Sequence, residues 1–123
     1  MRVLVVDDSS TMRRIITNSL NRLGHEDVLE AANGREGIER LTDAAGAVDL
    51  IITDWNMPEM SGIDFVRTVR ALEKLRDLPV LMVTTNAGKD DIMQAMQAGV
   101  SHYIVKPFTP DTFKEKVEAA LAR

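Results

Sequence analysis

Five short apolar runs, rich in β-branched residues, alternate with segments of helical periodicity, and this alternation restricts the fold more than any other feature. The runs cover residues 2–7, 26–31, 51–56, 79–85 and 103–107, and the second is the weakest. Near-continuous apolar character is typical of parallel strands that are covered on both faces. The sequence therefore predicts strands buried between layers of helices.

The segments between the runs have apolar residues at helical spacing, which predicts one helix after each strand. One face of the first helix, which ends before Gly24, carries Met12, Ile15, Ile16, Ser19, Leu20 and Leu23. The fourth helix, closed near Gly99, is marked by Ile92, Met93, Ala95 and Met96.

Capping residues indicate where the remaining helices begin. The last helix starts at Pro110, with Thr109 as its N-cap. Helices over residues 34–44 and 62–75 are each opened by a pair spaced as a capping box: Asn33 with Glu36, and Ser61 with Asp64.

Five consecutive strand–helix units, (βα)5, predict an α/β fold with a doubly wound five-stranded parallel sheet of the flavodoxin-like class. The common strand order is 2-1-3-4-5, and its ligand crevice lies at the carboxyl ends of strands 1 and 3. The length of 123 residues suits one domain, which we expect to span residues 1–123.

Composition narrows the class of protein. Apolar residues make up 45% of the chain and charged residues 28%, which is typical of soluble globular domains. No apolar run approaches the ~20 residues of a membrane span, and the start is too short and acidic for a signal peptide. Cysteine is absent, and the net charge is −4 with no basic stripe. We therefore expect a cytoplasmic protein that contacts neither membrane nor nucleic acid directly.

Polar residues stand where four of the predicted strands end. Asp7 and Asp8 follow the first strand, Asp54 ends the third, Thr84 ends the fourth and Lys106 ends the fifth. Because parallel strands share one carboxyl edge, we expect these side chains to converge there.

Three carboxylates this close would repel one another unless a cation joined them. Mg²⁺ suits a site of a few carboxylates, waters and phosphate oxygens. Lys106 adds a point charge that can hold a carboxylate or a phosphoryl oxygen. Asp54, at the centre, is then a candidate nucleophile towards phosphorus.

Taken singly, these residues have ordinary structural explanations: helix caps for Asp7 and Asp8, a turn for Asp54, a strand position for Thr84 and solvent exposure for Lys106. Their combination favours a functional site, because chance rarely gathers five such residues at one sheet edge. His25 and His102 lie outside the cluster, and we interpret both as surface or strand-end residues.

Four stretches that together cover essentially the whole chain resemble the receiver domains of two-component response regulators. The closest resemblance within that family is to the single-domain chemotaxis regulators of the CheY type. In this order and spacing the stretches are highly specific: "VLVVDDSSTMRRI", "DLIITDWNMPEMSG", "PVLMVTTNA" and "AGVSHYIVKPFTPDTF".

The resemblance implies a role for each residue of the acidic edge. Asp54 matches the phosphoacceptor, which also belongs to the metal site. Asp8 matches the direct Mg²⁺ ligand, and Asp7 matches the acidic partner that usually acts through water. Asn56 matches the position whose backbone carbonyl ligates the metal.

The resemblance also implies how the site would signal. Thr84 matches the hydroxyl that moves to the phosphoryl group, and Lys106 matches the lysine that pairs with the aspartate or its phosphate. Tyr103 matches the aromatic switch residue, although it is also explained as an ordinary strand aromatic. Family members usually have a cis peptide before the proline that matches Pro107. Asn56, Asn86 and Thr85 stand where the family varies, and their effect on phosphate lifetime stays open.

The implied partners are a histidine kinase of the chemotaxis type, a downstream target such as the flagellar motor switch, and a possible phosphatase. The readout face would be formed by the fourth helix, the fifth strand and the fifth helix, with Lys89, Met93, Tyr103, Val105 and Lys116 on or near it. Such a domain is not an enzyme beyond its own phosphorylation and dephosphorylation. Two alternatives remain: a receiver cut from a longer regulator with a DNA-binding or enzymatic output domain, and a flavin-binding enzyme of similar topology. Flavin is disfavoured, since Asp7 and Asp8 would repel a phosphate.

Overall fold

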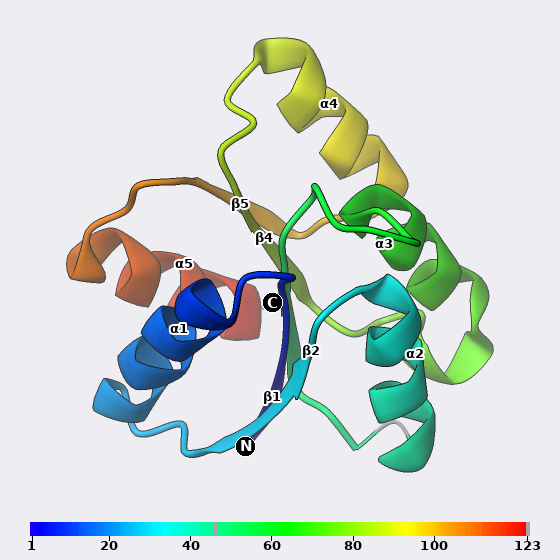
Figure 1. Cartoon of the computed structure of the whole chain (residues 1–123), viewed down its shortest axis with the longest axis horizontal. Helices are drawn as coiled ribbons and strands as arrows, with labels where there is room; N and C mark the ends of the chain where they lie inside the picture. The colour runs from blue at the N-terminus through cyan, green and yellow to red at the C-terminus, as the bar shows by residue number, and fades with distance from the viewer. Residues whose placement is uncertain (46, 123) are drawn as a thin grey trace.

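A five-stranded parallel sheet forms the centre of the computed structural model, which describes residues 1–45 and 47–122 (Figure 1). The strands are β1 (Arg2–Val6), β2 (Asp27–Ala31), β3 (Leu50–Thr53), β4 (Val80–Thr84) and β5 (His102–Val105). They lie in the order β2-β1-β3-β4-β5, and every neighbouring pair is parallel. The predicted fold class and strand order are confirmed.

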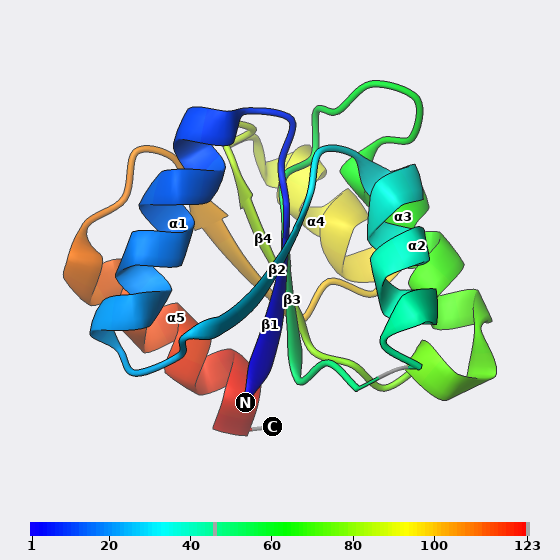
Figure 2. The ribbon, with the colours of Figure 1, turned by 60° about the horizontal axis from the view of Figure 1, so that its bottom comes forward.

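One helix follows each strand, and together the helices cover both faces of the sheet. They are α1 (Ser10–Arg22), α2 (Gly34–Asp43), α3 (Gly62–Ala71), α4 (Lys89–Ala98) and α5 (Pro110–Ala122). Figure 2 shows α1 and α5 on one face and α2, α3 and α4 on the other. Two apolar clusters result, one on each side of the strands. None of the helices described is long and apolar enough to cross a membrane.

The predicted N-caps are present, and they leave the aspartates after β1 uncommitted to capping. Ser9, not Asp7 or Asp8, caps α1, because its Oγ accepts a hydrogen bond from the Met12 amide at 3.1 Å. Asn33, Ser61 and Thr109 cap α2, α3 and α5 in the same way. Only half of the capping box at Asn33 is formed, since the Glu36 carboxylate accepts from the Ala32 amide at 3.2 Å instead.

Two expectations about the helices were wrong in detail. The helix predicted over residues 62–75 ends at Ala71, and a separate 3₁₀ turn covers Glu73–Leu75. The break exposes Leu72 and turns Leu75 into the core, so tertiary packing overrides local propensity. Ile15 was expected on the buried face of α1, yet it is 44% exposed, because the face turned to the sheet is centred on Ile16 and Leu20.

Candidate functional site

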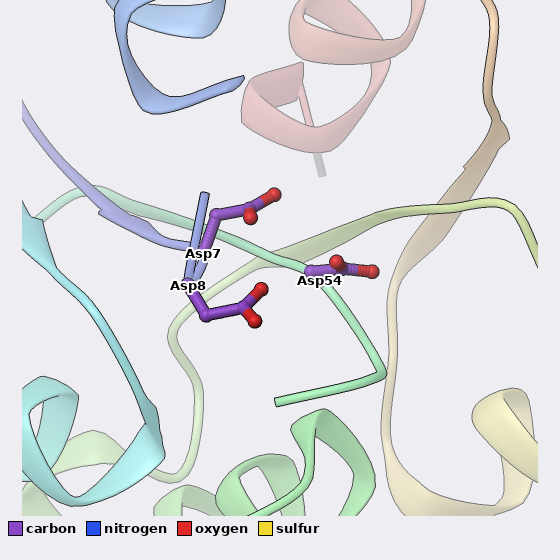
Figure 3. Close-up of side chains that lie close together, drawn as sticks. All are labelled: Asp7, Asp8 and Asp54. Atoms are coloured by element: carbon purple, nitrogen blue, oxygen red, sulfur yellow. The ribbon is translucent and has the colours of Figure 1, made fainter. Parts of the chain in front are cut away.

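Three aspartates meet at the carboxyl edge of the sheet, as Figure 3 shows. One carboxylate oxygen from each of Asp7, Asp8 and Asp54 lies within 4.8 Å of the others. Asp7 is 1% exposed and Asp54 9%, whereas Asp8 is exposed. The β1 and β3 strands are neighbours in register, Val6 beside Thr53, so the residues that follow them must lie side by side.

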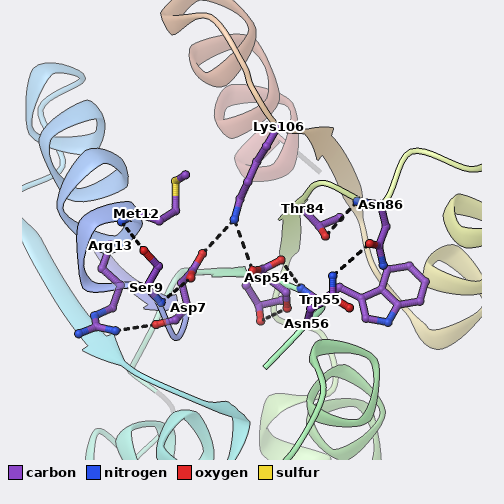
Figure 4. Close-up of polar contacts among 11 residues, drawn as sticks. Asp7, Ser9, Met12, Arg13, Asp54, Trp55, Asn56, Thr84, Asn86 and Lys106 are labelled. Atoms are coloured by element: carbon purple, nitrogen blue, oxygen red, sulfur yellow. Dashed lines mark hydrogen bonds and ion pairs between the residues drawn. The ribbon is translucent and has the colours of Figure 1, made fainter. Parts of the chain in front are cut away.

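Lys106 reaches this cluster from the end of β5. Its Nζ lies 3.2 Å from Asp7 Oδ2 and 3.3 Å from Asp54 Oδ2, and Figure 4 shows the amine between the two carboxylates. The peptide bond from Lys106 to Pro107 is cis, as the resemblance implied. One ammonium therefore neutralises part of the charge of three carboxylates, and the site retains a net negative charge.

Asp7 is held by its neighbours in a position where it stays mostly buried. The Ser9 amide donates to its Oδ1 at 2.9 Å, and Arg13 donates to its carbonyl at 2.6 Å. Burial raises the pKa of Asp7 above its ordinary value, with Asp54 adding to the effect and Ser9 and Lys106 opposing it. The ionised form of Asp7 would thus be stabilised by a further cation.

The backbone around Asp54 is packed without spare room. Its Oδ1 accepts a hydrogen bond from the Trp55 amide at 2.6 Å, and its own amide donates to the Val6 carbonyl at 3.0 Å. The Gly62 amide closes the following loop onto the Trp55 carbonyl at 2.7 Å. A Cβ at Gly62 would lie 2.0 Å from the Asp54 carbonyl oxygen, so the loop can return to α3 here only with glycine.

Asn86 contacts three of the predicted site residues on the β4 side of Asp54, and Figure 4 shows its contacts with Thr84 and Asn56. Its amide donates to the Oγ1 of the fully buried Thr84 at 3.3 Å, and its carbonyl accepts from the Tyr103 hydroxyl at 2.7 Å. Its side-chain oxygen accepts from the Asn56 amide group at 3.0 Å. The family resemblance implied that Asn56 and Asn86 stand at variable positions, but nothing in the sequence showed that they contact each other.

Burial raises the pKa of Tyr103 to about 12, with Asp91 and Asp54 adding to the effect. The side chain is 9% exposed and belongs to the apolar cluster on the α2, α3 and α4 side of the sheet. Its hydroxyl is therefore a neutral hydrogen-bond donor at neutral pH, tied to the loop that leads from β4 into α4.

The donor set fits a small, hard divalent cation. Carboxylate oxygens are the ligands that Mg²⁺ prefers, and its small coordination sphere suits a site with two or three of them and room for water. The exposure of Asp8 leaves one side of the cluster open to solvent. The two histidines lie elsewhere: His25 beside the C-terminal ends of α1 and α5, and His102 at the opposite end of β5 from Lys106.

Comparison with known proteins identifies this arrangement. The family model described as the response regulator receiver domain matches residues 3–118. The chain belongs to the response regulator receiver family. This assignment decides against the flavin-binding alternative.

Within that family, the similarity is to chemotaxis regulators. The chain is 57% identical over 121 residues to the chemotaxis protein CheY1 of Helicobacter pylori strain J99, covering 98% of this chain and 97% of that protein. It is 58% identical to the chemotaxis protein CheY homolog of Campylobacter jejuni, covering 98% and 92%. The solved structure of chemotaxis regulator CheY4 of Vibrio cholerae superposes with a TM-score of 0.89 at 35% identity, covering 98% of each chain.

These relatives are covered over nearly their whole length. The comparison thus favours chemotaxis regulators over multidomain regulators as the relatives of this receiver domain. A receiver domain of the CheY type is a signalling protein and does not belong to a classical enzyme family.

Proposed function

We propose that this receiver domain accepts a phosphoryl group on Asp54 from a histidine kinase, in a Mg²⁺-dependent reaction. The observation that carries the proposal is the position of the Asp54 carboxylate, between the Lys106 ammonium and the acidic pair of Asp7 and Asp8. The Asp54 carboxylate is paired with the Lys106 ammonium and, at 9% exposed, can still be reached from solvent.

In the transfer, an Asp54 oxygen forms a bond to phosphorus while the bond from phosphorus to the kinase histidine breaks. The electron pair of that bond stays on the imidazole, which takes up a proton. Mg²⁺, held by Asp7, Asp8, Asp54 and the Asn56 carbonyl, would neutralise phosphoryl oxygens in this step. Lys106 would stabilise the same developing charge, while the Trp55 amide orients the carboxylate.

The acyl phosphate formed on Asp54 would then change the hydrogen bonds that Asn86 makes with its neighbours. It brings three strong acceptor oxygens and up to two negative charges, and the Thr84 hydroxyl is the nearby donor that can turn to them. That movement would break the contact from the Asn86 amide to Thr84, and Asn86 also holds the Tyr103 hydroxyl. A local change in charge would thus bias the position of Tyr103 between two states.

The proposed readout face lies on α4, β5 and α5. Met93 is 52% exposed and Val105 37%, which are large fractions for apolar side chains. Lys89 is also exposed, Lys116 is partly buried, and Tyr103 is buried. Exposed apolar side chains together with lysines on these elements suit a partner protein with a complementary acidic and apolar surface.

The named partners follow from the family and are part of the proposal. We expect a chemotaxis-type histidine kinase as donor, the flagellar motor switch as target, and a phosphatase where the acyl phosphate is long-lived. All of these act in the cytoplasm, and residues 1–123 would form one domain. Its only catalysis would be its own phosphorylation and dephosphorylation.

Incubation with acetyl phosphate, with and without Mg²⁺, followed by intact mass, tests the proposal. We expect a Mg²⁺-dependent gain of one phosphoryl group, accompanied by a change in Trp55 fluorescence. Asp54→Asn should abolish the gain and keep the fold, whereas Asp64→Asn, an exposed aspartate at the start of α3, should be labelled like the wild type. Labelling of Asp54→Asn at the wild-type rate would refute the nucleophile. Neither mass gain nor fluorescence response in the wild type would refute a working site.

A further inference from the structure

The loop between β3 and α3 is fastened at its tip to the start of α2. Glu59, in this loop, has a left-handed backbone with φ of 66°, which is unfavourable for a residue with a side chain. Its Oε2 accepts a hydrogen bond from the Asn33 Nδ2 at 3.0 Å, and Arg35 Nη2 lies 3.6 Å from the same oxygen. An unfavourable backbone persists where surrounding contacts hold it, and these contacts do so here.

Asn33 is suited to this contact because it is only 6% exposed and both ends of its amide are used. Its Oδ1 caps α2 by accepting from the Glu36 amide at 2.9 Å, and its Nδ2 donates to Glu59. A buried amide that lost the Glu59 carboxylate would be left with an unpaired donor, which is costly. The capping hydrogen bond of Asn33 thus fixes the direction of its Nδ2, and the hydrogen bond from Nδ2 holds the Glu59 carboxylate in place.

Packing beside this hydrogen bond reinforces it. A Cβ at Gly34 would lie 2.9 Å from both Cγ and Sδ of Met60, so Met60 is packed directly over the first residue of α2. At the other end of the loop, the Gly62 amide holds the Trp55 carbonyl. Asn56 lies between these two fixed points, and its side chain is tied across to Asn86.

We propose that Asn33 and Glu59 are positioning residues that set the affinity of the site for its divalent cation, by fixing where the Asn56 carbonyl lies. The inference rests on the proposed function, in which that carbonyl is a metal ligand. Neither Asn33 nor Glu59 would touch the cation. Their contact keeps the loop from swinging away from α2 and carrying the carbonyl with it.

The Mg²⁺ affinity of one variant, Asn33→Asp, distinguishes a positioning role from a simple effect of charge, because the two predict opposite changes. Asn33→Asp keeps an oxygen that caps α2, since aspartate and asparagine cap about equally well. It also places a second carboxylate against Glu59, which breaks the contact. A long-range charge effect would make Mg²⁺ bind more tightly to this variant. Loss of the contact would make Mg²⁺ bind more weakly.

The experiment is a Mg²⁺ titration of the unphosphorylated protein, followed by calorimetry and by Trp55 fluorescence, with thermal unfolding of each variant. We expect Asn33→Asp to weaken binding about tenfold, the lower end of what one charge-assisted hydrogen bond contributes, and to lower the Tm through loss of the same contact while the protein stays folded at the assay temperature. The double variant Asn33→Asp with Glu59→Gln has the wild-type net charge and reverses the donor and the acceptor. It should bind within about twofold of the wild type.

Glu39→Gln is the matched control for the change of charge at position 59. Glu39 is the exposed partner of Arg35 on α2, at 3.0 Å, and it has no contact with the loop among the described residues. We expect its Mg²⁺ affinity to stay within about twofold of the wild type. Equal or tighter binding by Asn33→Asp, or no recovery in the double variant, would overturn the positioning role. A wild type that does not bind Mg²⁺ would overturn both this inference and the proposed function.

Discussion

Helices α4 and α5 flank β5 on opposite faces of the sheet, and they are anchored very differently. The buried side chains of α5 are Phe113, Val117 and Ala120, and Phe113 stacks on Phe108 with ring centroids 5.4 Å apart. The buried residues of α4 are two alanines, Ala95 and Ala98, which are 0% and 9% exposed. Its larger side chains include Met93 and Met96, which are 52% and 42% exposed.

The difference shows how one domain combines a firmly packed helix, α5, with a helix that can change position, α4. Hydrophobic stabilisation grows with the apolar area that is buried, at roughly 25 cal/mol per Å². A helix held by a buried phenylalanine and a buried valine costs more to displace than one held by two alanines and a partly buried isoleucine, Ile92. The weakly anchored helix is the one whose preceding loop contains Asn86, which contacts both Thr84 and Tyr103. The less firmly anchored helix, α4, therefore lies next to the proposed phosphorylation site.

The largest effect is expected at Phe113, which tests whether α5 is the firmly anchored helix. Phe113→Ala removes a ring that is 1% exposed, and we expect a loss of about 3–5 kcal/mol in the free energy of unfolding. Urea denaturation with a constant m-value would measure it. A loss below about 1 kcal/mol would mean that α5 is not the firmly held helix.

The ionisation of Tyr103 tests how well the α4 side of the sheet shields this side chain from solvent. Its pKa is about 12 in the folded protein against an ordinary 10.0, so between these values the unfolded state loses its proton first. Stability is therefore fully present below pH ~10 and is lost as pH rises towards ~12, by up to about 3 kcal/mol. Tyr103 is the only tyrosine in the chain, so phenolate absorbance in the near ultraviolet reports this group alone.

A native titration midpoint near pH 10 would contradict the buried, hydrogen-bonded position of Tyr103. Tyr103→Phe supplies the control, because it keeps the ring and removes the titrating group. The alkaline loss of stability in this variant should be smaller by the amount that Tyr103 contributes.

Hydrogen exchange compares the two helices directly. We expect the amides of α4 to exchange faster than those of α5, because less apolar surface must be exposed to open α4. Ala95→Gly should lower the protection of α4 by about a further 1 kcal/mol and leave that of α5 unchanged. Equal protection of both helices in the wild type would remove the distinction between them.

The smallest effect is expected at Met93. Met93→Gln changes an exposed side chain, so the free energy of unfolding should shift by less than about 0.5 kcal/mol. If the readout face is assigned correctly, the same variant should weaken binding of the phosphorylated domain to its target. Parallel unfolding and binding measurements would separate the two roles, and a large loss of stability would show that Met93 belongs to the core.

The sheet and the gathering of residues at its edge could be predicted from the sequence, because both depend on patterns that the chain states locally. Apolar runs and helical spacing predict the units, and the handedness of their crossovers leaves few topologies. Asp7, Asp54 and Lys106 meet because each directly follows or ends a strand. Roles in phosphoryl transfer came from family resemblance, and they stay predictions.

Other features depend on contacts between distant segments and had no local signal. No residue in "RALEKL" breaks a helix, so the end of α3 at Ala71 follows from the burial of Leu75. The contact of Asn33 with Glu59 joins residues 26 apart, and that of Asn56 with Asn86 joins residues 30 apart. Both contacts link loops whose paths are set by the whole fold, so spacing along the chain does not reveal them.

Gly62 has a practical consequence for anyone who would build a sensor or a tuned signalling circuit from this domain. Any side chain at that position would press on the backbone of the phosphoacceptor itself, since even a Cβ would lie 2.0 Å from the Asp54 carbonyl oxygen. In a mutational library that randomises the whole loop, most variants would therefore carry a side chain at position 62 and would have a disrupted site. Diversity confined to residues 57 and 58, with Glu59 and Gly62 retained, would sample phosphate lifetime and partner specificity while the reacting carboxylate stays in place.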